Sequence, residues 1–135
     1  MPKVASIARY DAAEDVIFVD ATGLDVQELD VVDAIFDELE LLSAKFPNRY
    51  ALVCFKDVQF GSQAVVEHYG TRTIAWQKNV KAVLRYAADD PILRAQIRTE
   101  AMKHQKSGMR SNLYEDRESA VAAVRAMKSI DARRR

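Results

Sequence analysis

The chain has 135 residues, of which 49% are apolar and 30% are charged, a composition typical of one folded domain and not of a disordered segment. A chain of this length buries about two thirds of the surface that it exposes when unfolded, so folding requires no disulfide or metal ion. No stretch is apolar enough to cross a bilayer or to act as a secretory signal. We therefore expect a cytoplasmic protein without a membrane partner.

The net charge of zero hides an uneven distribution along the chain. Residues 1–60 hold 12 acidic and 5 basic side chains, a net charge of −7, whereas residues 61–135 carry +7. If the fold keeps these groups on separate faces, the resulting dipole would orient a charged partner or favour a homodimer. The alternative is that the charges lie on solvated helix faces.

The first elements form a predicted hairpin followed by a helix. Two strand candidates, Val4–Tyr10 and Val16–Asp20, are separated by a short polar connection. Asp25 and Glu28 have the spacing of a helix capping box, so a first helix is expected to begin there. Apolar residues then recur every three or four positions until Pro47 ends the helix.

The centre of the chain predicts a buried strand and a second helix. Residues 50–55 are almost continuously apolar, as expected for a central strand that is covered on both faces. Cys54, the single cysteine, lies in this run and is interpreted as a buried structural thiol. The next helix is predicted from Ser62, and Gly70 is a candidate break within it.

The last third predicts strand, helix, strand and helix. Val80–Ala88 resembles a strand with one partly wet face, and Asp90 with Pro91 starts a helix that Gly108 ends. A short strand over residues 112–115 and a helix over residues 117–129 complete a single domain, 1–129, followed by a basic tail, 130–135. This order predicts an α/β fold with a mixed, mainly parallel central sheet of about five strands, an N-terminal antiparallel hairpin and about four helices.

The junction at Ser62 is the best candidate for a functional surface. It follows the central strand and a turn, Lys56–Gly61, and a serine at a helix start can cap free backbone N–H groups. A phosphate at this position would meet the same donors and the positive end of the helix. The candidate phosphorylation or partner surface comprises Asp57, Gly61, Ser62, Gln63 and Val66. The alternative role of Ser62 is that of an ordinary N-cap.

The marked segments resemble the STAS fold of anti-sigma-factor antagonists and its SpoIIAA-like relatives from Val16 to Met127. Three segments carry the resemblance: the strand Tyr50–Phe55, the turn Asp57-Val58-Gln59-Phe60-Gly61-Ser62, and the entry Glu115-Asp116-Arg117-Glu118-Ser119-Ala120-Val121 into the last helix. The resemblance implies that Ser62 is the phosphorylated position and that the surface around it binds an anti-sigma-factor-like kinase. SpoIIAA-like relatives without this switch are the other interpretation, because the chain has Phe60-Gly61-Ser62-Gln63-Ala64 at the turn.

Other kinds of chemistry have little support in the sequence. His68 and His104 belong to no recognised metal or hydrolase motif, and no phosphate-binding glycine loop is present, so we predict no cofactor, no metal and no catalytic residue. Acidic residues at the predicted strand ends are interpreted as caps and turn residues, with a divalent cation site as the alternative. The basic residues form no nucleic-acid-binding module. The leading hypothesis is a noncatalytic regulatory or protein-binding module, and the alternative is a small-ligand carrier or sensor.

Overall fold

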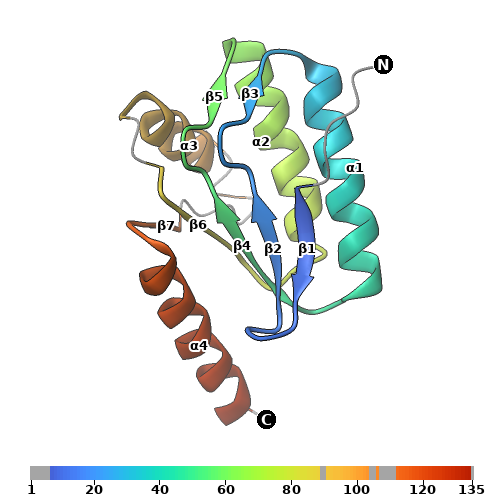
Figure 1. Cartoon of the computed structure of the whole chain (residues 1–135), viewed down its shortest axis with the longest axis vertical. Helices are drawn as coiled ribbons and strands as arrows, with labels where there is room; N and C mark the ends of the chain where they lie inside the picture. The colour runs from blue at the N-terminus through green and yellow to red at the C-terminus, as the bar shows by residue number, and fades with distance from the viewer. Residues whose placement is uncertain (1–6, 89–90, 104–105, 107–111, 135) are drawn as a thin grey trace.

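The centre of the computed structural model is a five-stranded sheet (Figure 1). Across the sheet the strands are β1 (Ala8–Asp11), β2 (Val16–Asp20), β4 (Tyr50–Cys54), β6 (Val83–Tyr86) and β7 (Leu113–Tyr114). β1 is antiparallel to β2, and all other neighbours are parallel. The structure describes residues 7–88, 91–103, 106 and 112–134. The predicted mixed, mainly parallel sheet with an N-terminal hairpin is confirmed.

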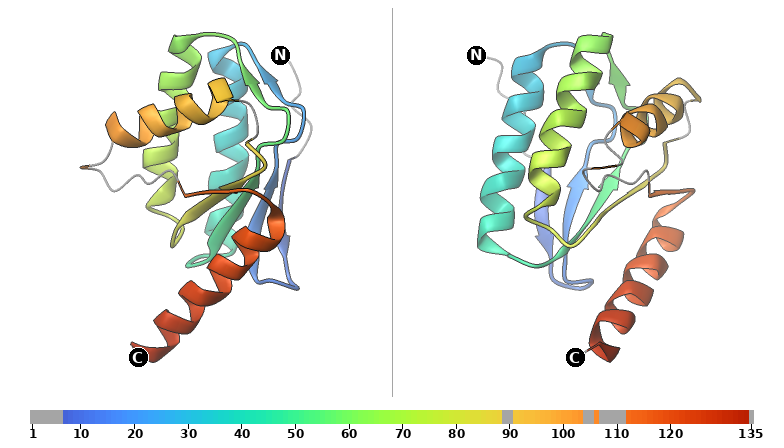
Figure 2. Two further views of the ribbon diagram at one scale, coloured as in Figure 1. Left: turned by 90° about the vertical axis from the view of Figure 1, so that its left-hand side faces the viewer. Right: turned by 180° about the vertical axis from the view of Figure 1, so that it is seen from behind.

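Helices cover both faces of the sheet. The described residues form four of them: α1 (Leu29–Lys45), α2 (Gln63–Gln77), α3 (Pro91–Lys103) and α4 (Arg117–Arg133). α1 and α2 lie side by side on one face, α4 crosses the opposite face, and α3 packs against α2 (Figure 2). The fold therefore has three layers, with α3 at the flank.

The core is divided into two apolar clusters by the sheet itself. Because successive side chains of a strand point to opposite faces, Ile17 and Val19 of β2 lie under α1 and α2, whereas Val16 and Phe18 lie under α4. All five residues of β4 are buried, which confirms the predicted central strand. Cys54 is buried in the cluster under α4, as predicted for a structural thiol.

A second, two-stranded sheet was not predicted. β3 (Asp25–Val26) pairs in parallel with β5 (Gln59–Phe60) beyond the ends of the central strands (Figure 1). The predicted capping box at Asp25 and Glu28 is therefore wrong. Asp25 lies in β3, and the N-cap residue of α1 is Glu28, whose side chain forms no capping hydrogen bond in the described part of the chain. Pairing with β5 holds residues 25–26 extended, so the helix begins only at Leu29.

Several element boundaries also differ from the predictions. α2 continues through Gly70 without a break. β6 is shorter than predicted and all four of its residues are buried, so the expected wet face is wrong, and Arg85 is only 2% exposed. α4 continues to Arg133, which makes residues 130–133 of the predicted tail helical. The first strand begins at Ala8, and the predicted helix signals Asp90 and Gly108 lie outside the described residues.

Charges from the two halves of the chain pair with one another in the fold. Arg72 of α2 contacts Asp33 of α1 at 2.7 Å, and Arg125 of α4 contacts Glu14 at 2.8 Å. Part of the sequence-level charge asymmetry is therefore neutralised within the molecule, and homodimerisation stays a prediction. No helix within the described ranges combines the length and apolar character that crossing a bilayer requires.

Candidate functional site

Ser62 is the N-cap of α2, which is the role that the sequence offered as the alternative to a phosphorylation site. Its backbone is extended, with φ −155° and ψ 165°, and its Oγ accepts a hydrogen bond from the Val65 N–H at 3.3 Å. Its carbonyl accepts the first helical bond from Val66 at 3.1 Å. The side chain is exposed, so the hydroxyl caps the helix and faces solvent at the same time.

The segment that leads to Ser62 is held by backbone hydrogen bonds. We call residues 56–62 the Ser62 turn; it includes β5. Gln59 N–H donates to the Leu24 carbonyl at 2.9 Å, and Gly61 N–H donates to the Val26 carbonyl at 2.8 Å. Gly61 lies close to Gln27: a Cβ at this position would displace the end of the Gln27 side chain and would lie 3.1 Å from the Gln27 Cα. The turn is therefore fixed against the segment that precedes α1.

Asp57 lies near the start of the Ser62 turn, before β5, and is exposed. Its φ of 57° is in the left-handed region, which aspartate tolerates better than most residues. The neighbouring Val58 is 2% exposed and anchors this part of the turn in the core. Asp57 thus contributes a solvent-exposed carboxylate that precedes β5, whereas Ser62 follows β5.

A groove lies between α2 and α3 directly beside Ser62. Its volume is about 370 Å³, and it is lined by Gln63 and Val66 of α2 and by Pro91, Ala95, Gln96, Thr99 and Glu100 of α3. We call it the α2–α3 groove. Two of the five predicted surface residues, Gln63 and Val66, line it. Val66 is only 4% exposed, so it forms part of the wall and not of the outer surface.

Glu100 and Gly70 bring the two helices together beside the groove. Glu100 is 3% exposed, and its side chain packs where Gly70 has no Cβ: an added methyl group would lie 3.0 Å from Oε2. Lys103 on the same helix contacts Glu67 at 3.4 Å and Glu100 at 3.9 Å. Gly70 therefore permits the close approach of α3, which explains a glycine inside an unbroken helix.

The residues contributed by α3 were not predicted as part of the site. Ala95 and Thr99 are one helical turn apart, as are Gln96 and Glu100, so the four lie on one side of α3. Their spacing could have indicated a mixed face of small and polar side chains. The sequence holds no signal that brings this face to α2, because the contact depends on how the helices pack.

His68 belongs to a polar contact between α1 and α2. Its Nε2 lies 2.7 Å from Asp33 Oδ1, which also accepts a hydrogen bond from Arg72 at 2.7 Å. The hydrogen bond with His68, followed by that with Arg72, lowers the pKa of Asp33 although partial burial opposes this effect. Arg72 also contacts Asp37 and Glu40, and its guanidinium lies over the Phe36 ring. We interpret this cluster as a link between the two helices.

Acidic residues at the strand ends have local roles. Asp20 accepts hydrogen bonds from the backbone and hydroxyl groups of Thr22, which lower its pKa. Asp116 caps α4 by accepting the Ser119 N–H at 2.8 Å, as expected for acidic residues at the strand ends. Within the described ranges, no three histidine, cysteine or acidic side chains are grouped so that they could hold a metal ion. Asp89 and Asp90 lie outside those ranges.

The space between the sheet and the helices α1 and α2 is nearly filled. A cavity of about 20 Å³ remains there, surrounded by apolar side chains that include Ile35, Phe55 and Trp76. This volume holds about one water molecule. An apolar ligand would have to separate the helices from the sheet in order to enter.

Comparisons with protein-family models, with curated proteins and with solved structures gave no match. The resemblance to the STAS fold therefore stays a prediction, and the functional interpretation depends on the geometry of the Ser62 turn and the α2–α3 groove.

Proposed function

We propose that the chain is a noncatalytic, STAS-like regulatory module that binds a partner protein through the Ser62 turn and the α2–α3 groove. One observation carries the proposal: Gln63 and Val66, which follow Ser62 on α2, line the groove. A partner segment lying in the groove would therefore meet the Ser62 hydroxyl at its end. The buried lone thiol, Cys54, favours a cytoplasmic location for this module.

The lining of the groove suits a short protein segment. Val66, Pro91 and Ala95 offer apolar contact for a small side chain of the partner. The amides of Gln63 and Gln96 could form hydrogen bonds with the partner backbone. Binding sites of this kind combine apolar walls with a few polar groups that fix the orientation of the ligand.

Phosphorylation of Ser62 would regulate this contact. The hydroxyl is exposed, and the first turn of α2 contains no acidic residue that would repel a phosphate. The positive end of the helix and its free N–H groups would accept about −1.5 to −2 charges. We propose an anti-sigma-factor-like kinase as the partner, with its affinity lowered by the added negative charge.

An Ala95→Arg variant tests the groove. Ala95 is exposed on α3 and lines the groove, so an arginine there would fill the groove without disturbing the core. Ala75→Arg is the matched control, because Ala75 is an exposed helical alanine on α2 outside the groove. The proteins retained by the immobilised wild-type chain are identified, and their binding to each variant is titrated. We expect one partner whose affinity is lost in Ala95→Arg and kept in Ala75→Arg.

The Ser62→Ala and Ser62→Asp variants test the regulation. If phosphate weakens the contact, Ser62→Asp binds the same partner less tightly than Ser62→Ala. Equal affinities of both variants would contradict the switch while leaving the groove as a binding site. Equal binding of the partner by wild type and Ala95→Arg would contradict the groove itself.

A further inference from the structure

α4 is attached to the domain by smaller apolar contacts than α1 and α2. Its buried residues are Ala120 and Val124, whereas α1 buries Phe36 and α2 buries Trp76. The hydrophobic contribution grows with the apolar area removed from water, so two small side chains contribute less than large aromatic ones. Half-buried Val121, Ala123 and Met127 add to this contact, but α4 buries no aromatic side chain, so its apolar attachment is smaller than that of α1 or α2.

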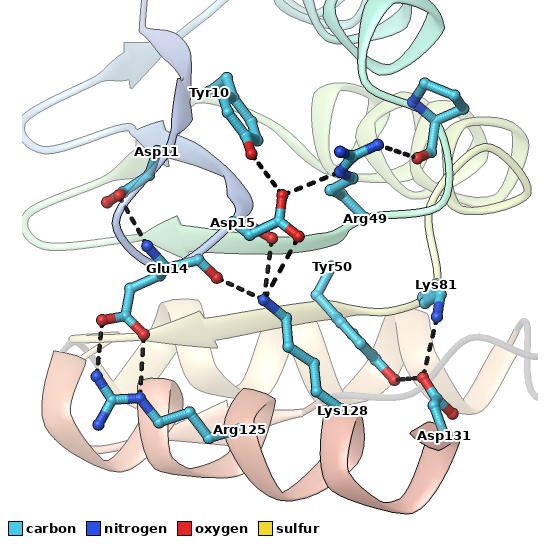
Figure 3. Close-up of polar contacts among 11 residues, drawn as sticks. Tyr10, Asp11, Glu14, Asp15, Arg49, Tyr50, Lys81, Arg125, Lys128 and Asp131 are labelled. Atoms are coloured by element: carbon cyan, nitrogen blue, oxygen red, sulfur yellow. Dashed lines mark hydrogen bonds and ion pairs between the residues drawn. The ribbon is translucent and has the colours of Figure 1, made fainter. Parts of the chain in front are cut away.

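Polar contacts supplement this attachment along the second half of α4 (Figure 3). Arg125 donates two hydrogen bonds to the Glu14 carboxylate, at 3.1 and 2.8 Å. Lys128 Nζ donates to the backbone carbonyls of Glu14 and Asp15. Asp131 accepts hydrogen bonds from the Tyr50 hydroxyl at 2.5 Å and from Lys81 at 3.1 Å. We call these contacts between α4, the β1–β2 turn and the starts of β4 and β6 the α4 clamp.

The α4 clamp is accessible to solvent. It borders an open pocket of about 450 Å³ that is lined by Tyr50, Lys81, Lys128 and Asp131, among others. The Arg125 side chain is 69% exposed. Exposed ion pairs are weak and are screened by salt, because the Debye length falls from about 10 Å at 0.1 M to about 3 Å at 1 M. At this pocket Lys128 donates to carbonyls of the β1–β2 turn and Lys81 donates to Asp131 of α4, so both hold α4 in place.

The surface beneath α4 is apolar and includes a thiol whose accessibility can be measured. Phe18, Leu52 and Leu84 belong to the cluster that α4 covers, and so does the single cysteine, Cys54, which is 8% exposed. The single tryptophan, Trp76, lies in the other cluster, under α1 and α2. Cys54 therefore shares an apolar cluster with Ala120 and Val124 of α4, whereas Trp76 belongs to the cluster on the other face of the sheet.

We propose that α4 is a releasable cover: the α4 clamp opens before the rest of the domain unfolds and uncovers an apolar face centred on Leu52 and Leu84. This release is independent of the α2–α3 groove, which involves other elements. It gives the domain a second, conditional apolar surface whose exposure increases with ionic strength.

Alkylation of Cys54 tests the release. The rate is measured with a neutral reagent such as iodoacetamide, at concentrations where it is proportional to the reagent, while Trp76 fluorescence reports the remainder of the fold. Raising NaCl from 0.05 M to 1 M should increase the rate by about fivefold without a change in fluorescence, as expected from screening of exposed pairs. An unchanged rate, or a rate that rises only together with a change in fluorescence, would overturn the proposal.

A pair of variants separates release from general destabilisation. Glu14→Gln removes the ion pair with Arg125 in the α4 clamp and should accelerate Cys54 alkylation about two- to fivefold. Glu67→Gln removes a comparable exposed pair with Lys103, between α2 and α3, and should leave the rate unchanged. Equal acceleration by both variants would show that Cys54 responds to overall stability and would overturn the proposal.

Discussion

The substitution Gly70→Ala distinguishes between intrinsic helix preference and packing. In an exposed helix interior, replacing glycine by alanine stabilises by about 1 kcal/mol. At Gly70 the added methyl group would lie 3.0 Å from Oε2 and 3.1 Å from Cδ of Glu100. These contacts are tight, so the Glu100 side chain, which is 3% exposed, would have to shift by a few tenths of an ångström. Such overpacking costs about 1–3 kcal/mol, so we expect a net loss of stability of about 1 kcal/mol.

A double-mutant cycle with Glu100→Ala isolates the packing effect. Without the Glu100 side chain the methyl group has space, so Gly70→Ala should now stabilise by about 1 kcal/mol. The expected coupling energy between the two sites is therefore about 2 kcal/mol, a magnitude usual for residues in contact. The assay is equilibrium unfolding in urea, followed by the fluorescence of buried Trp76. Stabilisation of similar size in both backgrounds would refute the reasoning, because α3 would then yield to the methyl group without cost.

Three further predictions concern Ser62, Tyr50 and Arg72. Ser62→Ala should lower the free energy of unfolding by about 1 kcal/mol because the Val65 N–H loses its acceptor. Ser62→Asp keeps an acceptor and should be at least as stable as wild type. Equal urea midpoints for Ser62→Ala and wild type would contradict this prediction. Burial, followed by the hydrogen bond to Asp131, raises the pKa of Tyr50 to about 12. The protonated Tyr50 hydroxyl therefore stabilises the folded state fully below its ordinary pKa of 10.0, and this stabilisation is lost as the pH rises toward 12. Melting temperatures from pH 9 to 11.5 should therefore fall less steeply for Tyr50→Phe than for wild type, and parallel curves would exclude the effect. Arg72→Met should lower the free energy of unfolding by about 1 kcal/mol in 0.05 M NaCl and by less in 1 M NaCl, because the ion pairs with α1 are partly exposed. If urea titrations show the same loss of stability at both salt concentrations, the effect belongs to packing on Phe36.

The central sheet could be predicted because its signals are local. The continuous apolar run at β4 and the apolar segment of β2 each identify a strand without knowledge of its partner, and the alternation of strands with helices then implies parallel pairing. β3 and β5 gave no such signal. Each has two residues, and their extended conformation depends on pairing across more than thirty positions of sequence. The Asp25 to Glu28 spacing matched a capping box that this pairing prevents.

The candidate site was only half predictable for a related reason. Ser62 and Gln63 were identified because helix capping is encoded within a few residues. The α3 wall of the groove depends on packing between helices. The residue that best indicates this packing, Gly70, was misinterpreted. Gly70 suggested a break in α2, since glycine weakens an isolated helix, but the absence of its side chain instead admits Glu100 of α3.

The unpredicted β3–β5 pair explains why the Ser62 turn is suited to recognition. Two backbone hydrogen bonds to the carbonyls of Leu24 and Val26 hold the turn, and buried Val58 anchors its first half, while the side chains of Asp57 and Ser62 remain exposed. A segment fixed in this way loses little conformational entropy when a partner binds, so more of the contact energy appears as affinity. A free loop with the same polar side chains would lose more. The short ribbon therefore links the fold to the proposed function, because it presents an exposed hydroxyl from a rigid backbone at the end of the groove.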